Sequence, residues 1–295
     1  LWVASVDYAN DVSIGQNILK QLMDIRNKIR NTARFLLGNL HDFNPATDSV
    51  NYDDLPELDR YMLHRISEVF TEVTEAYESF QFFKFFQTVQ NFCVVDLSNF
   101  YLDIAKDRLY ISAPDAARRR SCQTVLHIAL ENLTKAIAPV LCHLAEDIWQ
   151  FLPYEKPCES VFQAGWVTLD PQWQQPELAQ TWGKLRQLRT EVNKVMESAR
   201  MAKAIGASLE AKVLIHIVDP EFRTLLDRYN GADLSVDGLR YLVLASQVEL
   251  LDDAGAINQL DFKAQTESFS IGITNADGHK CDRCWNYSEQ VGTFS

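Results

Sequence analysis

Apolar residues recur at intervals of three and four through the first half of the chain, and this spacing restricts its fold more than any other feature. An α-helix of 3.6 residues per turn places such residues on one face. The spacing predicts five long helices, over residues 14–37, 56–80, 82–104, 114–137 and 139–152. Because each helix has an apolar face to bury and the connections are mostly short, a helical bundle is expected.

Several details sharpen this prediction. Gly38 and Asn39 are expected to end the first helix, and residues 41–54 are polar and typical of turns. The third helix is apolar on almost every face, which is typical of the middle of a bundle. Pro114 and Pro139 are expected to open the fourth and fifth helices, because proline suits a first helical turn.

Residues 153–176 interrupt the helical pattern. They contain four prolines together with Trp166 and Trp173, so we expect an ordered loop and a domain boundary here. A long helix is expected to resume at about Glu177 and to end at Gly206.

After Gly206 the apolar spacing changes to two, the period of a half-buried strand. Strands are predicted at residues 211–217, 241–251 and 269–273, with a short helix after Asp219. The fold class is therefore mainly α, a helical bundle followed by a small α+β module and a short tail. The expected parts are a bundle (1–155), a loop and long junction helix (156–205), the α+β module (206–275) and the tail (276–295).

The composition excludes several classes of protein. No apolar run approaches the ~20 residues of a membrane-spanning helix, and the N-terminus has no secretory signal, so no membrane partner is expected. Without such a signal, the six cysteines favour a reducing, cytoplasmic location over a disulfide framework. The chain does not begin with Met, and we expect that it starts within a larger protein.

Residues 278–285 read Gly-His-Lys-Cys-Asp-Arg-Cys-Trp, with Cys281 and Cys284 three positions apart. A tight turn can point both sulfurs at one ion, and structural zinc sites commonly use two such pairs. A single pair supplies half of a zinc site, to which His279 could add a ligand. A redox dithiol and an incidental pair are the alternatives.

Basic residues follow one side of the first predicted helix, where Lys20, Arg26, Arg30 and Arg34 fall away from the apolar stripe. The planar guanidinium of Arg binds phosphate oxygens well, so such a row can follow an RNA backbone. The alternative is a helix face that contacts only water.

A second basic cluster is expected where the third and fourth helices meet. Its members are Lys106, Arg108, Arg118, Arg119 and Arg120. The net charge of −12 disfavours a general nucleic-acid binder, but two basic clusters in an acidic chain indicate separate fields of opposite sign. We therefore predict that Arg118, Arg119 and Arg120 bind RNA together with the row on the first helix.

No catalytic constellation is present in the sequence. There is no P-loop, no GxGxxG and no GxSxG. His127 and His143 lie in apolar helical sequence and are expected to be packed or capped, so we predict no catalytic residue.

Three stretches together resemble the C-terminal region of bacterial-type isoleucyl-tRNA synthetases, a family of class I aminoacyl-tRNA synthetases. They are LWVASVDYANDVSIGQNILKQLMDIRNKIRNTARFLLGNL, WGKLRQLRTEVNKVMESARMAKAIGASLEAKV and GHKCDRCW. The resemblance spans essentially the whole chain in the right order. The GHKCDRCW tail favours the isoleucyl family over the related valyl and leucyl families.

The resemblance implies an anticodon-binding bundle, a junction helix and the first knuckle of a truncated zinc module. Cys281 and Cys284 would bind zinc, with the second cysteine pair beyond Ser295. The parent would join isoleucine to its tRNA with ATP and magnesium, and the upstream catalytic and editing domains would be further partners in a monomer. The HIGH and KMSKS signatures of the ATP site do not occur here, so the chain alone is expected to be inactive and to bind the tRNA for isoleucine.

Two other interpretations stay open. The chain could be a helical protein-interaction module with an incidental CxxC, or a free-standing RNA-binding protein. A nucleotide-binding half upstream and a second CxxC downstream would distinguish the synthetase from both.

Overall fold

The computed structural model describes residues 1–230 and 236–292, which fall into two compact units. The first unit is Leu1–Leu178 and the second is Ala179–Ser295. Residues 231–235 of the predicted module and 293–295 of the predicted tail lie outside the described residues. Among the described residues, no helix combines the length and hydropathy needed to cross a membrane.

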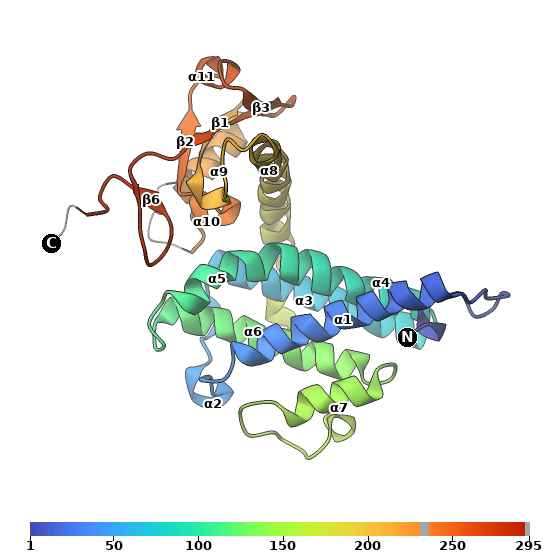
Figure 1. The fold of residues 1–295 in the computed structure, drawn as a ribbon. Helices are drawn as coiled ribbons and strands as arrows, with labels where there is room; N and C mark the ends of the chain where they lie inside the picture. Colours follow the sequence, from blue (N-terminus) through green and yellow to red (C-terminus); the bar gives the residue numbers. More distant parts are fainter. Residues whose placement is uncertain (231–235, 293–295) are drawn as a thin grey trace. The chain divides into compact units, whose positions relative to one another are not determined.

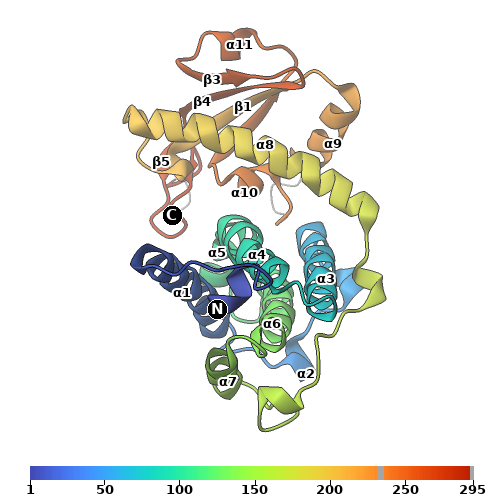
Figure 2. The same cartoon turned by 90° about the vertical axis from the view of Figure 1, so that its right-hand side faces the viewer.

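The first unit is a bundle of helices (Figures 1 and 2). Its α-helices are α1 (Gln16–Gly38), α2 (Pro45–Asp48), α3 (Glu57–Glu78), α4 (Phe82–Asn91), α5 (Leu102–Tyr110), α6 (Ala117–Ile137) and α7 (Cys142–Gln150). α6 contacts α1, α2, α3, α5 and α7, and most of its side chains are buried. The predicted mainly helical fold is confirmed, with α6 as the helix that holds the bundle together.

Most of the predicted helix ends in this unit agree with the structure. α1 ends at Gly38, with Asn39 as its C-cap. The prediction that Pro114 and Pro139 open helices is wrong, because α6 and α7 begin three residues later. Pro114 lies instead in a turn that the Ala116 N–H closes on the Ala113 carbonyl at 3.1 Å, a position that proline favours.

The predicted third helix is continuous but not uniform. A π-helical stretch, Phe92–Tyr101, joins α4 to α5 and extends the helical segment to Tyr110. The Ser98 hydroxyl donates to the Cys93 carbonyl at 2.8 Å within this stretch. Phe92 and Phe100 are buried, as expected for the middle of a bundle.

The loop after α7 packs on the first unit. Trp166 donates its indole N–H to Thr74 Oγ1 on α3 at 2.8 Å, and the Gln175 N–H donates to His64 Nδ1 at 3.0 Å. Short 3₁₀ turns occur at Val161–Gln163 and Pro171–Trp173. The loop is therefore ordered, and it belongs to the unit that ends at Leu178. The four-part division of the chain stays a prediction.

The second unit combines a long helix with a sheet (Figure 2), which has four strands. Its elements are α8 (Pro176–Met201), β1 (Ala211–Ile217), α9 (Pro220–Asn230), α10 (Leu239–Val243), β2 (Gln247–Leu251), α11 (Gly255–Asn258), β3 (Phe262–Gln265) and β4 (Phe269–Asn275). The strand order is β2-β1-β4-β3, with β1 and β2 parallel and the other pairs antiparallel. This is the predicted small α+β module.

Two details of the module differ from the sequence-based expectation. Residues 241–251 are not one strand, because α10 occupies the first part and Leu244 adopts a left-handed conformation with φ 55° before β2. β3 was not expected, since its four residues are too few to show a clear period. The helix expected to end at Gly206 ends at Met201.

Candidate nucleic-acid interface

The row on α1 consists of Lys20, Arg26, Arg30 and Arg34, and all four side chains are exposed. On a neighbouring arc of the helix, Ile29, Ala33 and Leu36 are buried in the bundle. The predicted separation of an apolar and a basic face is therefore present. The basic face is not needed for packing.

No described residue neutralises the charges of this row. Among residues 1–230 and 236–292, none of its members forms an ion pair, and the one hydrogen bond is from Arg26 Nη1 to Asn27 Oδ1 at 3.3 Å. A row of cations without carboxylate partners creates a positive field next to the helix. This arrangement suits phosphate oxygens better than it suits an internal structural role.

The second predicted cluster is arranged differently. Arg119 donates to Asp42 at 2.8 Å, and Arg120 donates to the Asp42 carbonyl at 2.7 Å. Arg118 donates to Asp107 at 3.0 Å. These three arginines thus join the start of α6 to the loop between α1 and α2 and to α5.

These contacts change the pKa of the Asp42 carboxyl group. Burial raises the pKa of Asp42, but hydrogen bonds from Arg119 and Gln123 outweigh burial and leave this pKa below its ordinary value. The Arg119 and Arg120 guanidinium groups are therefore already committed to internal anions. Their part in RNA binding stays a prediction, and the geometry favours the row on α1.

The remaining members of that cluster also have internal partners. Arg108 is buried against Asp59, with Nη1 2.8 Å from Oδ1. Lys106 pairs with Asp103 at 2.9 Å on the surface. The sequence could not show the contact between Arg108 and Asp59, because the two residues are 49 positions apart along the chain.

The two cysteines of the tail lie in a hairpin formed by β5 (His279–Lys280) and β6 (Tyr287–Ser288). The Trp285 N–H donates to the Cys281 carbonyl at 2.9 Å, and the Cys281 N–H donates to the Asn286 carbonyl at 2.9 Å. Gly278 has a φ of 86°, and a Cβ there would lie 2.2 Å from the carbonyl carbon of Ser288. Only glycine fits where the two strands approach so closely.

The hairpin favours a thiolate at Cys281. The backbone N–H groups of Cys284 and Arg283, and then the Cys284 side chain, lower the pKa of the Cys281 thiol. A thiolate is the form that binds zinc, so the donor chemistry of the pair fits that ion. In the described part of the chain, no group of three or more His, Cys, Asp or Glu side chains is placed to hold a metal, so the pair supplies two ligands.

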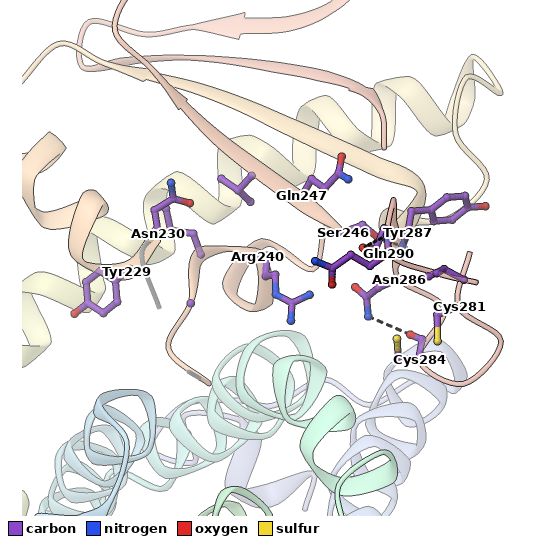
Figure 3. Close-up of a pocket in the computed structure, with 15 residues that line it drawn as sticks. Tyr229, Asn230, Arg240, Ser246, Gln247, Cys281, Cys284, Asn286, Tyr287 and Gln290 are labelled. Carbon is purple, nitrogen blue, oxygen red and sulfur yellow. Dashed lines mark hydrogen bonds between the residues drawn. The ribbon is translucent and has the colours of Figure 1, made fainter. Parts of the chain in front are cut away.

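A cavity of 640 Å³ lies between this hairpin and the α9–α10 region of the second unit (Figure 3). Arg240, Gln247 and Asn286 contribute polar groups to its lining, and the two cysteines lie at one end. The Arg240 guanidinium stacks on the Tyr241 ring, 4.4 Å from its centroid. Arg240 was not among the predicted site residues, because it lies just before the strand predicted over residues 241–251 and belongs to no basic cluster in the sequence.

The two histidines in apolar helical sequence, His127 and His143, have different surroundings. His127 Nδ1 lies 2.7 Å from the Tyr154 hydroxyl, and burial lowers the pKa of His127. This is the packed state expected from the sequence. His143 is exposed, so of the two states expected for it, packed or capped, it is not packed.

Comparison with known proteins adds independent information. Residues 59–215 match the family model described as the anticodon-binding domain of tRNA ligase. The whole chain is 69% identical over 299 residues to the isoleucine–tRNA ligase of Microcystis aeruginosa, and 70% identical over 298 residues to that of Gloeothece citriformis. The chain spans 31% of the length of each of these relatives.

Proposed function

The chain belongs to the family defined by the anticodon-binding domain of tRNA ligases, and from that premise we propose that it is the tRNA-binding, C-terminal part of an isoleucine–tRNA ligase. The observation that carries the proposal is the extent of the similarity. All of the chain, including the hairpin and the α+β module, aligns with isoleucine–tRNA ligases at 69–70% identity. A shared anticodon-binding bundle alone would not favour isoleucine over other amino acids.

The structure supports a physical account of how the tRNA is held. Unpaired anticodon-loop bases can be contacted at their edges and faces, while stem phosphates meet basic helices. Lys20, Arg26, Arg30 and Arg34 are the side chains that we propose for the phosphates, because they are exposed. Arg118, Arg119 and Arg120 are secondary candidates, since their guanidinium groups would have to leave carboxylates of the same unit.

Selection of the tRNA is distinct from selection of the amino acid. A binding pocket separates isoleucine from valine by one methylene, which is worth only about 1–3 kcal/mol. Contacts to the anticodon arm supply a second recognition step on the other substrate. A well-packed bundle suits this step, because it presents the basic face of α1 in a fixed geometry.

Zinc would have a structural role in this account. Cys281 and Cys284 would hold the ion, and two further ligands would come from outside the described residues, since structural sites usually close with four. The ion would stabilise a short hairpin that buries too little apolar surface to be stable by itself. The backbone N–H groups that favour the Cys281 thiolate prepare the site for it.

The remaining properties concern the whole ligase. Isoleucine activation with ATP and magnesium would take place in catalytic and editing domains upstream, and the ligase would act as a monomer. Six free cysteines and the use of tRNA in translation support a cytoplasmic location. The chain by itself should not activate isoleucine, because it carries no ATP-site signature.

Direct binding tests this proposal. The purified chain is titrated with a transcript of the tRNA for isoleucine and with the same transcript carrying a foreign anticodon loop. Tighter binding of the unaltered transcript supports the proposal. Equal binding of both, or none, overturns it, as would isoleucine-dependent exchange of pyrophosphate into ATP by the chain alone.

A further inference from the structure

A groove of 500 Å³ lies between α1 and α7 in the first unit. These two helices contact each other. Arg30, Arg34 and Leu37 line one side of the groove, and Leu144, Asp147, Ile148 and Phe151 line the other. Its volume lies within the range of small-molecule sites, about 300–1,000 Å³.

The groove has an apolar floor and an exposed aromatic ring at its edge. Leu144 and Ile148 are 8% and 4% exposed, whereas Phe151, directly after α7, is 76% exposed. A Phe ring in water next to an apolar floor contributes little to the stability of the bundle. It leaves a face on which another flat ring can stack.

Side chains of both charges surround this apolar floor. Arg30 and Arg34 form the end of the basic row, so the row leads along α1 into the groove. The carboxylate of Asp147 is the one acidic group in the lining, and among the described residues it forms no ion pair. A ligand for this site therefore combines negative charge, a flat apolar face and an edge that donates hydrogen bonds.

We propose that this groove binds one unstacked nucleotide of the tRNA loop. Its base would stack on Phe151 over the apolar floor, and its flanking phosphates would meet Arg30 and Arg34. The proposal rests on the proposed function and extends it by naming a base-binding site on α7. A duplex cannot supply such a ligand, because its bases are stacked and paired, whereas loop bases splay out onto aromatic side chains.

Asp147 gives the site a preference among bases. A carboxylate only accepts hydrogen bonds, so it favours a base edge that presents an amino or imino N–H. A base that presents a carbonyl oxygen there would face the carboxylate with no proton between them. Asp147 is thus a specificity-determining residue, whereas Phe151 contributes affinity for any base.

The experiment uses the purified chain and an RNA hairpin with the sequence of the isoleucine-tRNA anticodon stem-loop. In a set of such hairpins, 2-aminopurine replaces one loop base at a time. With the unmodified chain, the fluorescence of the probe should change strongly at one loop position, where the base leaves the loop stack for Phe151.

Two substitutions test the roles of the side chains. Phe151→Ala should weaken binding by about 5- to 150-fold, as expected for the loss of base stacking, and should abolish the fluorescence change. Phe162→Ala is the matched control, because Phe162 is 61% exposed in the same unit and does not line the groove. Asp147→Asn should reduce the discrimination between bases at that loop position while binding is retained.

The outcomes separate this inference from the proposed function. If the chain binds the hairpin and Phe151→Ala binds with unchanged affinity and fluorescence, the base-binding site is wrong and the proposed function stands. If the unmodified chain does not bind the hairpin at all, both are overturned. If the groove instead binds a protein, and the RNA hairpin does not compete with that protein for the groove, the inference is also overturned.

Discussion

Arg108 and Asp59 form a buried ion pair in the first unit, with Arg108 Nη1 2.8 Å from Asp59 Oδ1. The two residues are 1% and 0% exposed and belong to α5 and α3. Tyr101 donates its hydroxyl to the same carboxylate at 2.7 Å, and the Arg108 Nε–H donates to the Arg118 carbonyl at 2.8 Å. Satisfied partners on every side make this pair tolerable in an apolar bundle.

Removing one partner of this pair should destabilise the first unit strongly. Asp59→Ala leaves the Arg108 charge buried without a carboxylate, so the free energy of unfolding should fall by about 3–5 kcal/mol. Urea denaturation followed by circular dichroism measures this change. Lys106→Ala is the control, since its pair with Asp103 is exposed and should be worth at most about 1 kcal/mol. A loss below 1 kcal/mol for Asp59→Ala would contradict this role.

The half-buried His127 should make the stability of the first unit depend on pH. Burial lowers its pKa in the folded chain, whereas the unfolded chain takes up the proton near pH 6.5. Glu131 opposes this shift and Lys135 reinforces it. Between the two pKa values the unfolded state binds more protons, so the contribution of His127 is complete above about pH 6.5 and is lost as the pH falls.

Replacing the imidazole tests this dependence. The free energy of unfolding of the unmodified chain should fall more between pH 7.5 and pH 5 than that of His127→Gln, because the other titrating groups are common to both. Urea denaturation at the two pH values gives the difference. Parallel losses in the two proteins would show that His127 does not contribute.

The basic row on α1 should give tRNA binding much of its salt dependence. Replacing Arg26, Arg30 and Arg34 together by Ala should weaken binding and reduce the slope of log K against log salt by about one unit or less per phosphate contact. Lys28→Ala is a matched control, because Lys28 is exposed on the same helix but on another face. Stability should change little, since surface substitutions usually stay within about 0.5 kcal/mol. A triple variant with unchanged affinity and slope would shift the interface to Arg118, Arg119 and Arg120.

The cysteine hairpin should depend on Gly278. Gly278→Ala combines a left-handed backbone with a Cβ 2.2 Å from the Ser288 backbone, so the hairpin cannot close. Hydrogen exchange read by mass spectrometry should show lost protection over residues 278–288, with β1 and β4 still protected. Gly292→Ala is the matched control, because Gly292 has a φ of 83° but open space around it. Equal protection in the two variants would rule out the close approach as the cause.

The parts of the structure that follow from local pattern were predictable. The helix expected over residues 14–37 is α1, Gln16–Gly38, and the strand expected over 211–217 is β1. Both predictions depend on the spacing of apolar residues within one segment. This spacing distinguishes a helix from a strand, because the two place side chains on one face at different periods. The basic face of α1 was predictable for the same reason.

Contacts between distant segments were not predictable in this way. Arg119 and Asp42 are 77 positions apart, so the spacing of the three arginines could not show that they bind internal carboxylates. The groove is likewise lined by residues that are distant in the sequence, Arg34 on α1 and Phe151 after α7. Neither residue stands out in its own segment. The strand predicted over residues 241–251 is interrupted at Leu244. The apolar pattern of this segment did not indicate the left-handed backbone of that residue.

A footprint of the bound tRNA tests the central claim most directly. Hydroxyl radicals cleave the backbone of the isoleucine tRNA with and without the chain at moderate salt, and protection is read at every nucleotide. The account predicts protection confined to the anticodon stem and loop, and loss of the stem protection when Arg26, Arg30 and Arg34 are replaced by Ala. Protection of the acceptor end instead, or a footprint that the triple variant leaves unchanged, would contradict it.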